Sequence, residues 1–141
     1  MRKLQFRAWD KEKCEMVYDG IVDVSVGPWD ADHTSIFISF DGSVVGFDGD
    51  DGGKNGLHEH DANIHADRLI LMQLTGLRDK NGQEIYEGDI YLAEWAGAQP
   101  LEVYWDEYLG GFVDGSGDYV GEKAKVAEVI GNIWENPDLL K

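Results

Sequence analysis

Short segments that alternate apolar and polar residues, separated by turn-forming dipeptides, recur along most of this chain. Segments 21–26 and 89–95 alternate with a period of two, which is the period of a half-buried β-strand. Asp41-Gly42 lies in the middle of segment 35–47 and predicts a hairpin there. Helical periodicity is hard to find. The pattern predicts a mainly β protein with little helix, in which an antiparallel sheet closes toward a barrel or a sandwich.

The length and the cysteine content narrow the class of protein. A chain of 141 residues with 43% hydrophobic residues has enough length and apolar content to form a real core as a single domain. Cys14 is the only cysteine in the sequence, which excludes an internal disulfide and favours a reducing cytoplasm. The N-terminus lacks the apolar core of a signal peptide, and no apolar run approaches the length of a membrane span. We therefore expect a cytoplasmic protein without a membrane partner.

The composition changes along the chain and predicts three regions within the one domain, 1–141. Residues 1–47 form a β-rich N-terminal region. Residues 48–66 are rich in Gly, Asp and His and lack apolar periodicity, which predicts a flexible acidic loop. Residues 67–141 form the barrel-like core, and the last strand predicted in it is the segment 125–134. The apolar run at 67–77 has few β-branched residues, so its first half leaves a helix open as an alternative to a strand.

The net charge of -16 argues against nucleic-acid binding through phosphates, which needs clustered Lys and Arg. From Asn81 to Glu122 there are ten acidic residues and no Lys or Arg. Such a stretch is either a solvated surface or a surface for a basic partner. One alternative is an acidic DNA mimic that inhibits a nucleic-acid-binding protein. Another is nucleic-acid binding through the basic N-terminus, Arg2 to Lys13.

The segment from Leu74 to Ile90 is the most tightly specified in the chain. Asn81-Gly82 predicts a tight turn with positive φ at Gly82, between an apolar run and a short strand. These residues serve the fold, so we interpret the segment as structural. A functional interpretation depends on three residues that we expect to be exposed at the turn. This possible interaction surface comprises Arg78, Asp79 and Lys80.

The same segment carries a family resemblance. The sequence LMQLTGLRDKNGQEIYEGDIY at 71–91 resembles the signature of the YopX family of phage and prophage proteins. KLQFRAWDKEKCEMVY at 3–18 and VIGNIWENPDLL at 129–140 are similar to the same family, in the same order. The resemblance implies a small phage- or prophage-encoded cytoplasmic protein with an SH3-like β-barrel in its later half. It implies no activity.

Two groups in the loop contain ligands that metal ions use. His58, His60, Asp61 and His65 offer imidazole and carboxylate, but their spacing is not that of a rigid zinc motif. Residues 48–59 resemble a calcium loop, but its fifth position is a glycine that supplies no side-chain oxygen. We therefore expect no metal and no cofactor. A metal-dependent enzyme that uses the His58/His60/His65 cluster remains an alternative.

No catalytic signature is present: the sequence has neither a phosphate-binding G-x-x-x-x-G-K-[ST] nor a G-x-S-x-G. We therefore predict a non-enzymatic module that binds a protein of the host or the phage, and edge strands allow homo-oligomers. The aromatic residues lie in strand patterns, which favours core positions over a stacking platform. This set comprises Trp9, Trp95, Trp105, Trp134, Tyr86, Tyr91, Tyr104 and Phe112.

Overall fold

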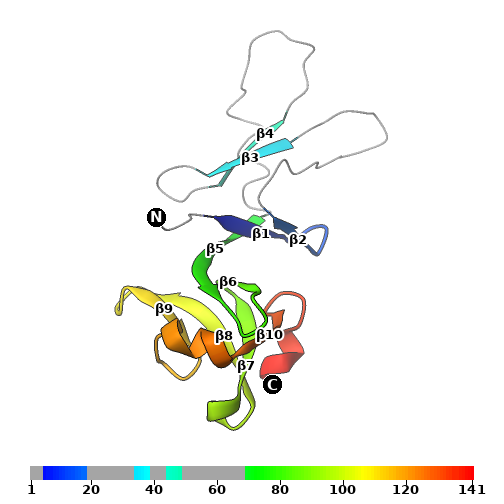
Figure 1. Ribbon diagram of the computed structural model, residues 1–141. Coiled ribbons are helices and arrows are strands. Elements are labelled where there is room, and N and C mark those ends of the chain that lie inside the picture. The colour runs from blue at the N-terminus through cyan, green and yellow to red at the C-terminus, as the bar shows by residue number, and fades with distance from the viewer. Residues whose placement is uncertain (1–4, 19–33, 39–43, 49–68) are drawn as a thin grey trace. The chain divides into compact units, whose positions relative to one another are not determined.

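The computed structural model describes residues 5–18, 34–38, 44–48 and 69–141, and these fall into two compact units (Figure 1). Unit 1 comprises Met1–Arg7 and Met72–Lys141, and unit 2 comprises Ala8–Leu71. The boundaries cut through two strands, β1 (Phe6–Asp10) and β5 (Leu69–Arg78). The predicted strand at 21–26 lies outside the described residues, and so does the predicted loop at 48–66 except for Asp48, which ends a strand.

Unit 2 holds most of the N-terminal strands. The turn between β1 and β2 is closed by Asp10, whose carboxylate accepts the amides of Glu12 and Lys13 at 3.0 and 3.1 Å. β3 and β4 pair antiparallel over five residue pairs, which confirms the predicted strand pairing, while the predicted Asp41-Gly42 turn lies outside the described residues. The strands are β1 (Phe6–Asp10), β2 (Glu15–Tyr18), β3 (Thr34–Ile38) and β4 (Val44–Asp48).

The strands outside the β3–β4 hairpin form two four-stranded antiparallel sheets, one of which curls into a half-barrel (Figure 1). The strand orders are β2-β1-β5-β6 and β10-β7-β8-β9, so β5 and β6 belong to the first sheet. The mainly β prediction is confirmed, and helix within the described ranges is limited to short 3-10 segments. The elements are β5 (Leu69–Arg78), β6 (Glu84–Tyr86), β7 (Asp89–Ala93), η1 (Glu94–Ala96), β8 (Gln99–Asp106), β9 (Gly111–Asp114), η2 (Gly121–Val126), β10 (Glu128–Asn132) and η3 (Pro137–Leu140).

The core of unit 1 lies between these strands and η2. Its buried members are between 0% and 1% exposed, and burial of each large apolar side chain contributes about 1.5–3 kcal/mol. Leu77, Leu101, Phe112 and Val129 pack against it from partly buried positions. The cluster comprises Ile85, Tyr91, Ala93, Val103, Val120, Ala124 and Ala127.

Two local predictions need correction. The helix considered for the first half of segment 67–77 is absent from its described part, because β5 runs from Leu69 to Arg78. The strand predicted at 125–134 begins only at Glu128, since η2 occupies the residues before it. A 3-10 turn there brings both Ala124 and Ala127 into the core, which an extended chain with period two cannot do.

Candidate interaction surface

The turn between β5 and β6 is hydrogen-bonded to the chain around β10 and so stabilises unit 1. The carboxylate of Asp79 accepts hydrogen bonds from the amides of Asn81, Gln83 and Val129, at 2.8, 2.9 and 3.0 Å. Burial raises the pKa of Asp79, but these backbone donors outweigh it and hold that pKa below its usual value. Asp79 is 5% exposed, so the expectation that it lies at the surface is wrong.

The geometry of this turn explains why its aspartate is buried. Gly82 has a φ of +83°, as predicted, but the loop is three residues wide rather than the two of the Asn81-Gly82 dipeptide. The amide of Asp79 donates to the carbonyl of Gln83, and the amide of Gly82 donates to the carbonyl of Asp79. This is the three-residue loop with a left-handed glycine, and it folds the carboxylate over its own amides. The amide of Lys80 then reaches the carbonyl of Ala127, just before β10.

Arg78 and Lys80 are exposed, as expected, but each already has a partner. Arg78 lies 2.9 Å from Glu84 and donates to the carbonyl of Gly82 at 2.7 Å. Lys80 lies 2.7 Å from Glu128, and the hydrogen bond to that carboxylate raises the pKa of Lys80. The two cations are therefore paired with carboxylates of two different strands, β6 and β10, and do not gather around a shared site.

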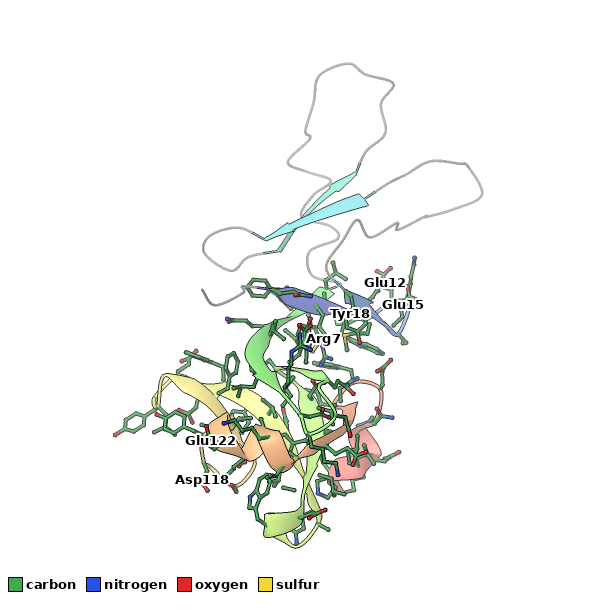
Figure 2. All side chains as sticks on the ribbon, in the orientation of Figure 1. Arg7, Glu12, Glu15, Tyr18, Asp118 and Glu122 are labelled. Carbon is green, nitrogen blue, oxygen red and sulfur yellow. The ribbon has the colours of Figure 1, made fainter. Side chains whose placement is uncertain are left out.

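A polar network joins β7, β9 and η2. The hydroxyl of Tyr91 donates to the carboxylate of Asp114 at 2.5 Å, and Lys123 Nζ lies 3.1 Å from the same oxygen. Ser116 Oγ also donates to Asp114, and Lys123 donates to Asp118 at 2.9 Å, beside η2 (Figure 2). Burial alone would lower the pKa of Lys123, but its bonds to these carboxylates raise it. Lys123 is therefore a fixed cation and a poor base for the Ser116 hydroxyl.

The β8–β9 hairpin carries exposed aromatic and apolar side chains at its distal end. Trp105 and Phe112 are paired across the strands, with ring centroids 5.0 Å apart and planes at 76°. The side chain of Tyr108 is 97% exposed, and Leu109 and Trp105 are each 41% exposed. We call this cluster the hairpin tip and define it by Trp105, Tyr108, Leu109, Phe112 and Tyr119.

Tyr119 joins the tip through a close approach to the hairpin backbone. Its hydroxyl donates to the carbonyl of Leu109 at 2.8 Å, and its ring lies against Gly111. A Cβ built on Gly111 would be 2.7 Å from that ring, so any other residue at this position would displace the ring of Tyr119. Tyr119 therefore fixes the position of the turn, while its own ring remains 55% exposed.

The turn of this hairpin does not require apolar residues. The carboxylate of Asp106 accepts the amide of Leu109 at 2.8 Å, and the amide of Gly110 donates to the carbonyl of Asp106 at 2.8 Å. Gly110 has a φ of +63°, and no atom lies within 4 Å of the place a Cβ would take. Asp106 and Gly110 thus set the backbone, and the residues between them are free to vary.

The remaining predicted positions are scattered. His58, His60, Asp61 and His65 lie outside the described residues, and within the described ranges no three His, Cys, Asp or Glu side chains are grouped to hold a metal ion. Cys14 is exposed in the β1–β2 turn. No helix among those elements combines the length and apolarity of a membrane span.

Arg7 belongs to the basic N-terminus that was considered for nucleic-acid binding, but it is not at the surface. Its guanidinium lies 2.6 Å from the carboxylate of Asp89 and 4.7 Å from the ring centroid of Tyr86, and the residue is 5% exposed (Figure 2). A buried, paired arginine cannot contact a phosphate without unfolding its surroundings.

The sequence pattern assigned all the strand aromatics to the core, and this is wrong for two of them. Trp95 and Trp105 are 43% and 41% exposed, whereas Trp9, Tyr86 and Tyr91 are buried. Tyr108 and Leu109 were not selected as site residues. A signal was available, since they lie inside an Asp-x-x-x-Gly turn where polar residues are usual.

One family model and two solved structures are similar to this chain. The model of the family described as YopX protein matches residues 5–141. The chain is similar to the crystal structure of protein EF1440 from Enterococcus faecalis, with 26% identity, a TM-score of 0.61 and full coverage of both chains. It is also similar to protein yopX from Bacillus subtilis, with 23% identity, a TM-score of 0.54 and coverage of 100% and 98%, a likeness that concerns the fold alone. No curated protein sequence matches the chain.

Proposed function

Because this chain belongs to the YopX family, whose model matches residues 5–141, we propose that it is a non-enzymatic protein-interaction module encoded by a phage or prophage. It acts in the host cytoplasm by binding a protein partner through the hairpin tip. Membership of the YopX family supports the proposed class of protein, and the exposed residues of the hairpin tip support the proposed binding surface.

The exposure of Tyr108 carries this proposal. A tyrosine that is 97% exposed gains almost nothing from its own fold, while aromatic side chains are enriched at the centres of protein interfaces. Leu109 and Trp105 extend the exposed apolar surface on either side of it in sequence. Single exposed apolar residues need no explanation, but a cluster around one turn favours a binding role.

Ser116 and Lys123 form the only serine–lysine pair among the described hydrogen bonds. The polar network around Asp114 supports a structural rather than a catalytic role for this pair. Ser116 Oγ lies 3.1 Å from Lys123 Nζ, which is the spacing of a nucleophile and its base. However, Lys123 is held as a cation by Asp114 and Asp118, so it has no lone pair to accept a proton. The network instead ties η2 to β9.

Affinity capture from host-cell lysate, quantified by mass spectrometry, tests this function. We expect the double variant Tyr108→Ser/Leu109→Ser to lose the proteins that the parent captures. The matched control is Val126→Ser/Leu140→Ser, which removes two exposed apolar side chains elsewhere in unit 1 and should leave capture intact. Equal capture by the parent and the Tyr108/Leu109 variant would exclude the hairpin tip as the interaction surface.

A further inference from the structure

We infer that the hairpin tip takes a cationic segment of its partner, in which Arg or Lys side chains lie against the aromatic rings. This inference rests on the proposed function and specifies the chemistry of the partner. It follows from the charge of the hairpin, the orientation of its rings and the way this chain pairs its own cations with aromatic side chains.

The charge of the hairpin has one sign. Asp106 and Glu107 lie within the turn, and no Lys or Arg occurs between Asn81 and Glu122. Lys123 is the first cation after this stretch, and both Asp114 and Asp118 already neutralise it. A partner that covers the tip therefore meets two carboxylates beside exposed rings, and a cation in the partner would compensate their desolvation.

The rings are arranged so that a cation can reach them. Trp105, Tyr108 and Tyr119 are 41%, 97% and 55% exposed, and Trp105 meets Phe112 edge to face rather than in a stack. A guanidinium or ammonium group within about 6 Å of the face of an exposed ring is stabilised by the ring quadrupole. Neighbouring carboxylates add to this attraction, which is the environment that Arg prefers at interfaces.

The chain uses the same chemistry internally. Arg7 lies 4.7 Å from the ring centroid of Tyr86 while it pairs with Asp89. Lys123 lies 5.7 Å from the ring centroid of Trp95 while it pairs with Asp114. Each of these sites combines a ring, a carboxylate and a cation. The hairpin tip combines the exposed rings of Trp105, Tyr108 and Tyr119 with the carboxylates of Asp106 and Glu107, and the described contacts place no cation of the chain on these three rings.

Other occupants fit less well. A nucleic acid would bring phosphates next to Asp106 and Glu107, which repel them. A second hairpin tip would bring the same carboxylates and no cation, so a symmetric contact through this surface would leave four acidic groups together. A cationic peptide satisfies both the rings and the acids.

Fluorescence anisotropy with three labelled decapeptides tests the inference on the full chain. The probes alternate Val with Arg, with Gln or with Glu. We expect the Arg peptide to bind at least about tenfold more tightly than the Gln peptide, with affinity falling as salt rises from about 0.05 M to about 0.3 M. The Glu peptide should not bind. Equal affinity for the Arg and Gln peptides would overturn the cationic inference.

Variants separate the hairpin tip from the overall acidity of the chain. Asp106→Asn/Glu107→Gln keeps an acceptor for the Leu109 amide and removes two charges at the tip. Glu122→Gln/Asp138→Asn removes two exposed charges elsewhere. We expect the first variant to weaken the Arg peptide at least about fivefold and the second less than about twofold. Equal weakening would show that only the net charge matters, which overturns the inference.

Failure of the inference and failure of the proposed function give different results. If Tyr108→Ser/Leu109→Ser abolishes capture from lysate while the three peptides bind alike, the interaction surface stands and its cationic partner does not. If Tyr108→Ser abolishes a concentration-dependent self-association seen by sedimentation, the occupant is a second copy and the inference is overturned. If the tip variants change neither capture nor peptide binding, both proposals fail.

Discussion

The β1–β2 turn and the β8–β9 turn share one backbone scheme and differ in what they display. In each, an aspartate carbonyl accepts the amide four residues later at 2.8 Å, and that later residue has a positive φ. In each, the aspartate carboxylate accepts the amide three residues later. The intervening residues are Lys-Glu-Lys in the first turn and Glu-Tyr-Leu in the second.

The residues that close each turn are therefore distinct from the residues that the turn exposes. Asp10 and Asp106 close the two turns with their carboxylates, so neither turn needs an apolar residue to form. Charged residues such as the Lys-Glu-Lys of the β1–β2 turn are usual in an exposed turn. Tyr108 and Leu109 therefore require another explanation, and binding is the one we propose.

The largest expected effect concerns a third aspartate turn, at Asp79. Here the carboxylate also bonds the amide of Val129 and so joins the turn to β10. Asp79→Ala leaves three amides without their charged acceptor, and we expect a loss of about 3 kcal/mol or more in the free energy of unfolding, against about 1 kcal/mol for Asp106→Ala. Urea unfolding measures both. Equal losses would mean that the contact with β10 adds nothing to the turn.

The same aspartate predicts an acid dependence. Hydrogen bonds hold the pKa of Asp79 and of Asp114 below the usual 3.8 in the folded state, although burial acts in the opposite direction. As pH falls below about 4, the unfolded chain takes up these protons first, so stability present at neutral pH is lost toward lower pH. Asp79→Asn should flatten the dependence of the urea midpoint on pH. An unchanged slope would remove Asp79 as its source.

Exchanging the three residues within the turn tests the comparison most directly. Replacing residues 107–109 by Lys-Glu-Lys copies the β1–β2 turn into the β8–β9 hairpin. We expect the free energy of unfolding to change by less than about 0.5 kcal/mol, because the exchanged residues are exposed. Partner capture should weaken by at least about tenfold, which corresponds to about 1.4 kcal/mol. If the exchange unfolds the protein, Tyr108 and Leu109 serve the fold after all.

Part of this fold could be predicted from the sequence alone. Alternation and turn dipeptides predicted most of the described strands, because the period of two reflects which side of a sheet is buried, but part of the strand predicted at 125–134 is η2. Alternation says which face a residue lies on, but not where along the strand the core ends. Trp105 shares its face with buried Val103, yet it lies beyond the covered part of the sheet and is exposed.

Asp79 shows a second limit of the sequence. Its neighbours Arg78 and Lys80 are exposed, and only the three-residue width of the loop turns the carboxylate inward. The Asn81-Gly82 dipeptide is compatible with two loop widths, so it could not decide the burial of Asp79. The contact with Val129 joins residues fifty positions apart, and no local pattern encodes it.

A smaller effect is expected from the residue with positive φ in each turn. Cys14 has a φ of 54°, where a side chain costs about 1–2 kcal/mol, whereas Gly110 adopts the same region freely. Cys14→Gly should therefore stabilise the protein by about 0.5–1 kcal/mol after the entropy cost of glycine. Gly110→Cys should destabilise it by about 1 kcal/mol, since nothing crowds that site. Changes of the same sign in both variants would contradict the shared scheme.

The smallest effect is expected at the two cations of the β5–β6 turn. Arg78→Ala/Lys80→Ala removes two exposed ion pairs, with Glu84 and Glu128. Because exposed pairs contribute little, we expect each loss to cost less than about 0.5 kcal/mol in urea unfolding. Partner capture should match the parent, since these cations are paired with Glu84 and Glu128 and lie outside the hairpin tip. If this variant folds normally but alone loses the partner, the interaction surface is at Arg78 and Lys80, and the apolar turn at Tyr108 has another purpose.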